Sequence, residues 1–272
     1  MGQQKMEKRL VTGVPSVRAV ALLWYNGDRV RLNMNIAAQK QLPVAQTLSA
    51  LAEASLVMLG TIHRDREAGA LLSEWLDYLK PDVITLEFSR YGMLFRKAHA
   101  SALRARLDAL LAKIALHPEP SRRKAVQALY DYIELPYEYT ETSRYADHCG
   151  IPLHLLDVDL FSHMHLRKID ELMDEENLRT WFSDHAPPDN EVDKERALAR
   201  LFFDKGIRTF EYTEEMLIRD KQVKEQLLLL ARHYQGKRIV HVCGWRHCAD
   251  QQNIFDSLRP VKVFVHDRSI CI

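Results

Sequence analysis

The chain is short of cysteine and glycine, and it lacks a long apolar run. Its 272 residues include four cysteines, ten glycines and ten prolines. Four cysteines do not make a disulfide framework in a chain of this length, so the thiols are expected to be reduced. No apolar stretch approaches the ~20 residues of a transmembrane helix, so no membrane-spanning segment is expected.

The chain also lacks an excess of charge of either sign. Its 38 Lys and Arg residues are balanced by 37 Asp and Glu residues, which leaves a formal net charge of +1. This balance gives no electrostatic basis for binding nucleic acid or an anionic membrane. The first ten residues, MGQQKMEKRL, have no apolar signal-peptide core, and Met6 departs from the myristoylation pattern. We therefore expect a cytoplasmic protein.

The hydrophobic residues, 47% of the chain, fall into short runs separated by segments of helical spacing. Short buried strands between helices indicate an α/β fold with a largely parallel central sheet and helices on both faces. Strands are expected at 56–60, 82–87, 152–157, 239–243 and 261–265. Helices are expected near 43–54, 67–80, 103–114, 126–133, 162–182, 192–203 and 213–234, the last with Gly236 as its C-cap.

One domain over residues 1–272 accounts for this pattern. Residues 1–50 are expected to form an accessory hairpin and helix, since 17–34 contain an Asn-Gly turn between strand-like segments. The core of the domain then covers about 55–267. Two helical insertions, at 95–145 and 160–205, are expected over a cleft.

Polar residues stand where the predicted strands end. Gly60–His63 follows the first strand, Glu87 ends the second, Asp157 ends the third, and Gly244–His247 follows the fourth. Sites in open α/β sheets form beyond the carboxyl ends of the strands, so these side chains are expected to converge. The two glycines are expected to let the backbone turn sharply and approach a ligand closely.

Two imidazoles and one carboxylate support two kinds of chemistry. His63, Glu87 and His247 have the ligand types of a divalent zinc, manganese or cobalt site with open positions for water. The same three groups can activate water by general-base catalysis without a metal.

These motifs resemble those of the TraB/PrgY/TIKI family, within the wider erythromycin esterase/ChaN-like group. Gly60–His63 and Gly244–His247 look like its two G-x-x-H motifs, and Pro81–Glu87 looks like its glutamate-bearing strand. Ile218–Asp220 is similar to its Arg-Asp element. The order and approximate spacing agree over roughly 55–267.

The resemblance implies paired motifs around a cleft and a metal-dependent hydrolase activity, because TIKI proteins act as metal-dependent proteases. Other relatives hydrolyse a macrolide ester, bind haem or block a peptide pheromone. Two hypotheses therefore stand. The first is a hydrolase acting on a peptide or ester, and the second is a protein that binds haem, iron or a peptide without turnover. Haem is the less expected cofactor, and a homodimer is left open.

The resemblance also suggests roles for single residues. His63, Glu87, His247 and Arg219 are the candidate catalytic residues, with Arg219 binding a carboxylate or an oxyanion of the substrate. Substrate-binding candidates are Arg90, Asp157 and Asp220; Arg96 is a second candidate for the arginine that follows the family's glutamate. A structural ion pair is the alternative for Arg219 and Asp220. Asp157 precedes Val158, whereas the family tends to show Asp-Arg.

The cysteines and a third histidine lie close to the last motif. His241 and Cys243 face the same side of a strand, and with Cys248 they could suggest a zinc site. A structural zinc normally needs a second short-spaced pair, which Cys149 and Cys271 do not supply. We therefore interpret Cys243 as a small buried hydrophobe and His241 as a hydrogen-bonded core residue.

Overall fold

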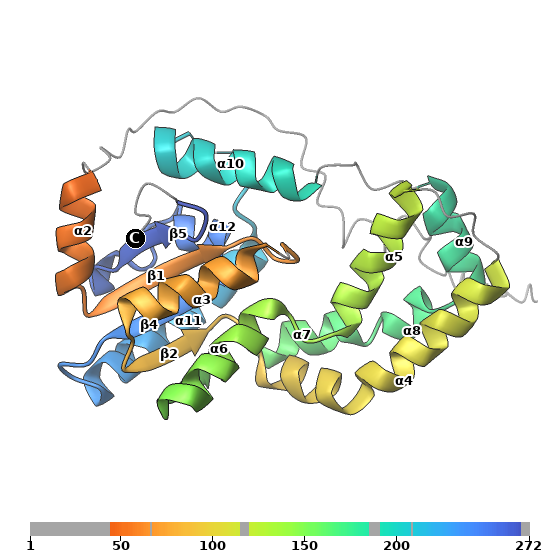
Figure 1. Cartoon of the computed structure of the whole chain (residues 1–272), viewed down its shortest axis with the longest axis horizontal. Helices are drawn as coiled ribbons and strands as arrows, with labels where there is room; N and C mark the ends of the chain where they lie inside the picture. The colour runs from red at the N-terminus through yellow and green to blue at the C-terminus, as the bar shows by residue number, and fades with distance from the viewer. Residues whose placement is uncertain (1–43, 66, 115–119, 185–190, 208, 268–272) are drawn as a thin grey trace, which may run out of the picture.

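The computed structural model describes residues 44–65, 67–114, 120–184, 191–207 and 209–267. The hairpin expected at 17–34 lies outside these residues. The described chain forms a parallel sheet covered by helices, with a group of further helices beyond the carboxyl ends of its strands (Figure 1).

Five strands of the described chain form one sheet, and every neighbouring pair in it is parallel. They lie in the order β3-β2-β4-β1-β5, so β4 and β1, which end in the two glycine motifs, are neighbours near the centre. The sheet confirms the α/β fold predicted from the sequence. The strands are β1 (Leu56–Thr61), β2 (Val83–Leu86), β3 (Leu153–Leu155), β4 (Ile239–Gly244) and β5 (Val261–Phe264).

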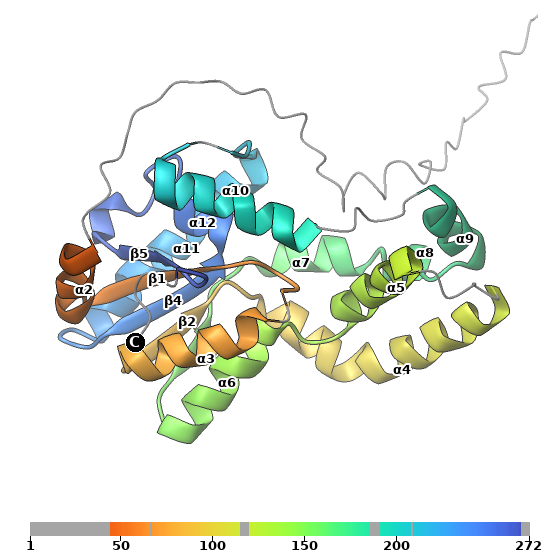
Figure 2. The ribbon, with the colours of Figure 1, turned by 45° about the horizontal axis from the view of Figure 1, so that its top comes forward.

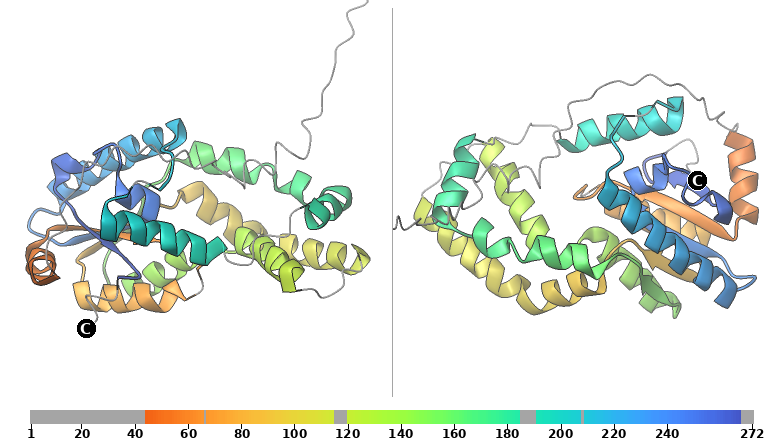
Figure 3. Two further views of the ribbon diagram at one scale, coloured as in Figure 1. Left: turned by 90° about the horizontal axis from the view of Figure 1, so that it is seen from above. Right: turned by 180° about the vertical axis from the view of Figure 1, so that it is seen from behind.

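Helices cover both faces of the sheet because alternate strand residues point to opposite sides. On one side, Val57 and Leu59 of β1 share a core with Leu72 of α3 (Ala68–Leu79). On the other, Met58 shares a core with residues of α11 (Glu214–His233), which lies in front of the sheet in the right-hand view of Figure 3. Two more helices contribute to the first side, α2 (Val44–Glu53) and α6 (Tyr137–Cys149).

A group of helices with its own core extends away from the carboxyl ends of the strands (Figures 1 and 2). It contains α4 (Arg90–Ile114), α5 (Pro120–Ile133), α7 (Asp159–Leu166), α8 (Ile169–Leu172) and α9 (Glu175–Asp184). A further helix, α10 (Glu191–Lys205), packs on α12 (Trp245–Ala249). None of the helices that the structure describes is long and apolar enough to cross a membrane.

The structure corrects three local predictions. The helix expected over 162–182 is divided into α7, α8 and α9, and the carboxylate of Asp174 accepts hydrogen bonds from the first backbone amides of α9. Helix α6 was not predicted, although Gly150 follows it in the left-handed conformation typical of helix ends. The C-cap of α11 is Tyr234, and Gly236 lies two residues further on.

Candidate functional site

A cavity of 760 Å³ lies beyond the carboxyl ends of the strands. Its walls combine the loop after β1, the end of β2, the start of α6, the inner side of α11 and the segment after β4. His63, Glu87, Asp157, Arg219 and His247 all line it. The structure therefore brings together five of the residues that the sequence suggested.

The two glycine motifs interlock at the floor of this cavity. A β-carbon on Gly244 would lie 2.8 Å from Nε2 of His63 and 3.6 Å from Cδ2 of His247. A β-carbon on Gly60 would lie 3.2 Å from Cα of Trp245. Each glycine thus makes room for a residue of the other motif.

The expected sharp glycine turn is not present at Gly244. Its backbone (φ −57°, ψ 142°) suits any residue, and the chain passes from β4 directly into α12. His247 is therefore presented by the first turns of a short helix. The need for glycine comes from close approach by His63.

His63 is oriented by a carboxylate that the sequence did not indicate. Its Nδ1 lies 2.8 Å from Oε1 of Glu138, at the start of α6, and Thr61 Oγ1 lies 3.2 Å from the same oxygen. Glu138 is buried, and its Oε2 has no hydrogen-bond partner among the described residues. The side chain of His63 is 60% exposed and lines the cavity, and Nε2 has no hydrogen-bond partner within the described residues.

His247 is oriented by a second carboxylate. Its Nδ1 lies 2.6 Å from Oδ1 of Asp220, and its Nε2 lies 3.1 Å from Oε1 of Glu87. Asp220 also accepts a hydrogen bond from the hydroxyl of Tyr212. In contrast to His63, this ring is buried between two acids, so its position is fixed on both sides.

Arg219 connects the acids that end β2 and β3. Its guanidinium donates to Glu87 Oε1 at 2.6 Å and makes two hydrogen bonds with Asp157, at 2.8 and 3.0 Å. The other oxygen of Glu87 accepts the amide of Gly244 at 3.0 Å. Glu87 is thus held by one cation and one backbone donor. Most of the hydrogen-bond donors of Arg219 are engaged by carboxylates of the protein itself.

Negative charge exceeds positive charge in this network. Four buried carboxylates (Glu87, Glu138, Asp157 and Asp220) accompany one guanidinium and two imidazoles. The balance favours a proton on each imidazole.

The pKa values of both histidines respond to this balance. Loss of solvent lowers the pKa of His63, but the hydrogen bond and charge of Glu138, with Glu87, outweigh this and raise it. Loss of solvent likewise lowers the pKa of His247, and the charge of Glu87 and the contacts with Asp220 raise it above its usual value. Both rings are therefore stronger bases than free histidine.

The donor set agrees only in part with a metal site. Both imidazoles direct Nδ1 to a carboxylate, which is how metal-ligating histidines are commonly oriented. However, Oε1 of Glu87 already binds the Arg219 cation, and Oε2 accepts the Gly244 amide. A metal ion bound to Oε1 would be repelled by the positive charge of Arg219. The described part of the chain contains no group of three His, Cys, Asp or Glu residues arranged to hold a metal ion. The arrangement as it stands does not fit a three-ligand metal site.

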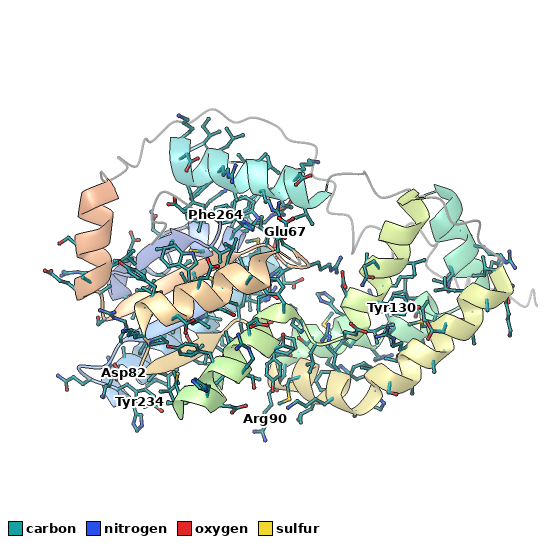
Figure 4. The ribbon with its side chains drawn as sticks, in the orientation of Figure 1. Glu67, Asp82, Arg90, Tyr130, Tyr234 and Phe264 are labelled. Atoms are coloured by element: carbon teal, nitrogen blue, oxygen red, sulfur yellow. The ribbon has the colours of Figure 1, made fainter. Side chains whose placement is uncertain are left out.

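Two arginines differ in how they relate to the cavity. Arg90, expected to bind substrate, is exposed at the start of α4, is not among the residues that line the cavity, and points outward at the lower edge of the molecule in Figure 4. Arg96, further along the same helix, lines the cavity. Of the two arginines considered after Glu87, the structure therefore places only Arg96 at the site.

His241 and Cys243 are core residues, as interpreted from the sequence. Nδ1 of His241 lies 2.9 Å from Oγ1 of Thr85, and burial lowers the pKa of His241 to about 4. Cys243 and Cys248 are buried and free in the core beside α11.

Comparisons of the chain with protein-family models, with curated proteins and with solved structures found no match.

Proposed function

We propose that the protein is a hydrolase that cleaves an ester or peptide bond with water activated by His63. The observation that carries the proposal is the pair of carboxylate-bound imidazoles beside Gly244, in a ligand-sized cavity. The likeness of the two G-x-x-H motifs to those of the TraB/PrgY/TIKI family supports the same activity.

His63 is the general base in this mechanism. Nδ1–H donates to Glu138, which fixes the tautomer and leaves the lone pair on Nε2, the nitrogen that accepts the proton. Nε2 takes a proton from water as the water oxygen attacks the substrate carbonyl carbon. When the tetrahedral intermediate collapses, the bond to the leaving oxygen or nitrogen breaks, and His63 returns the proton to that atom.

His247 is a positioning residue in this mechanism. Both of its ring nitrogens are engaged, one by Asp220 and the other by Glu87, so the ring holds these carboxylates in place at the floor of the cavity. Glu87 and Arg219 also serve as positioning residues, because their polar atoms contact one another, Asp157 and Gly244.

Hydrolysis of 4-nitrophenyl esters and of a fluorogenic peptide library tests the proposal. We expect turnover by the purified protein and loss of about 100-fold or more in kcat for His63→Ala. His148→Ala is the matched control, since His148 is an exposed histidine on the helix that carries Glu138. Equal rates for His63→Ala and the wild type would overturn the proposal. Binding of haem, iron or peptide without turnover would favour the alternative of a ligand-binding protein.

A further inference from the structure

One cation of the cavity wall has no acidic partner within the part of the chain that the structure describes. Arg96 donates from Nε to the Tyr132 carbonyl oxygen at 3.2 Å and from Nη1 to the Gly92 carbonyl oxygen at 3.3 Å. Its guanidinium carbon lies 5.6 Å from the ring centroid of Phe88 and 5.7 Å from that of Tyr132. Within the described residues, no carboxylate lies at ion-pair distance from Arg96.

The surroundings of Arg96 are built to hold this position. A β-carbon on Gly92 would lie 3.3 Å from Nη1 of Arg96, so glycine leaves room for the guanidinium to fold back onto α4. Ser89 accepts the Gly92 amide at 2.8 Å and fixes the start of the helix. The aromatic rings and the two carbonyl oxygens then orient the guanidinium plane.

The two cavity-lining acids on either side of Tyr132 in the sequence are engaged elsewhere. Glu134 pairs with Arg104, and Asp131 accepts a hydrogen bond from Gln127. A desolvated guanidinium without a counterion is costly, and loss of solvent together with Arg64 lowers the pKa of Arg96. A ligand anion would remove this cost.

A second arginine lies on the same side of the cavity. Arg64 directly follows His63, lines the cavity and acts electrostatically on both Arg96 and Tyr132. Its backbone is in the left-handed region (φ 65°), which is uncommon for a residue other than glycine and often marks a functional segment. The positive side of the cavity is therefore adjacent to the proposed general base.

From this arrangement we infer that Arg96 is a specificity residue that binds a carboxylate of the substrate. The inference rests on the proposed hydrolase function and names its substrate class as esters or amides whose acyl group carries a carboxylate. A substrate carboxylate is repelled by Glu87 and Asp220, the two acids that contact His247, and attracted by Arg96 and Arg64. The substrate thus binds in a single orientation, with its carboxylate at Arg96 and its reacting carbonyl group at His63.

The test compares an anionic ester, 4-nitrophenyl hemiglutarate, with a neutral ester of similar length, 4-nitrophenyl pentanoate. We expect wild-type protein to prefer the anionic ester in kcat/KM. Arg96→Gln should lower kcat/KM for that ester by about 10- to 100-fold and leave the neutral ester unchanged. Arg96→Lys should give an intermediate loss, because it keeps the charge without the planar fork. The control is Arg90→Gln, at an exposed arginine of the same helix, which should change neither ester.

Calorimetric titration with glutarate, against neutral glutaramide, separates this inference from the proposed function. Glutarate binding that persists in His63→Ala and is lost in Arg96→Gln supports the inference even if neither ester is cleaved. An equal fall for both esters in Arg96→Gln would overturn it while the hydrolase function stands. Glutarate binding that is absent from the wild type or equal in Arg96→Gln would also overturn it. Circular dichroism checks that Arg96→Gln is folded; if it is not, Arg96→Lys is judged by the same criteria.

Discussion

The imidazole of His63 occupies the space that a side chain on Gly244 would need, with Nε2 only 2.8 Å from the position of the missing β-carbon. This relationship joins a residue that follows β1 to the end of β4, 181 residues further along the chain. It explains the glycine of the second motif by the histidine of the first.

Gly244→Ala is expected to remove activity while the fold is kept. The new methyl group would meet only the tip of a side chain that is 60% exposed, so His63 can move away from Glu138 at little cost in stability. We expect a loss of about 100-fold or more in kcat, as for removal of a general base. Measured rates check the loss of activity, and thermal unfolding of the same sample checks that the fold is kept.

Gly60→Ala provides the contrast to this variant. There the methyl group would lie 3.0 Å from Cβ of Cys248 and 3.2 Å from Cα of Trp245, and both residues are buried. Overpacking against a fixed backbone should cost about 1–3 kcal/mol of unfolding free energy. If Gly244→Ala instead unfolded the protein and Gly60→Ala did not, the interlocking described above would be wrong.

The pH dependence of activity should report the contact between His63 and Glu138. Because Glu138 raises the pKa of His63, the base is protonated at low pH, and activity should rise with pH through that raised pKa. Glu138→Gln removes the charge, so the midpoint of this limb should move to lower pH while kcat at its plateau falls. A pH profile whose midpoint does not move would show that Glu138 does not act through His63.

Much of this architecture was predictable from local sequence patterns. The five strands are short apolar runs bounded by helices, and such runs specify a parallel sheet without knowledge of distant contacts. The carboxyl ends of parallel strands lie on the same side of a sheet, so residues that follow them are expected to be neighbours. This rule predicted that His63, Glu87, Asp157 and His247 lie close together.

What was missed lies on elements whose position depends on tertiary packing. Glu138 lies in the first turn of α6, a helix of mixed polarity whose main sequence signal was Gly150 beyond its far end. The choice between Arg90 and Arg96 depended on where α4 begins, which the cap at Ser89 determines. The partner of Arg219 depended on how α11 lies across the strand ends, and no spacing rule gives that.

Stability should depend on pH through His247. The pKa of this ring is raised in the folded protein, so its stabilising effect is complete below the pKa of the unfolded chain. This stabilisation is lost as the pH rises from the pKa of the unfolded chain through the higher pKa of the folded protein. Urea unfolding across neutral to alkaline pH should show this decline in wild type and a smaller decline in His247→Gln. A larger decline in the variant would contradict protonation of the ring between Asp220 and Glu87.

Arg219→Met is expected to destabilise the protein more than it weakens substrate binding. The substitution leaves Glu87 and Asp157 buried without their cation, and removing one partner of a buried ion pair costs about 3–5 kcal/mol. Arg219 is 21% exposed, so the lower part of that range applies. Chemical denaturation measures the loss. Unchanged stability with a raised KM would instead make Arg219 a substrate-binding residue.

Metal analysis decides between the two ways of activating water. Arg219 and the Gly244 amide occupy the oxygens of Glu87, so we expect activity to survive dialysis against a chelator. Plasma mass spectrometry of the native protein and of a Glu87→Ala/His247→Ala double variant gives the comparison. Near-stoichiometric zinc, manganese or cobalt that is lost in the double variant, with activity restored only by that metal, would require Glu87 to leave Arg219 and join His247 as a ligand. In that case the excess of buried carboxylates, which in the metal-free protein favours protons on the imidazoles, would be balanced by the metal ion instead.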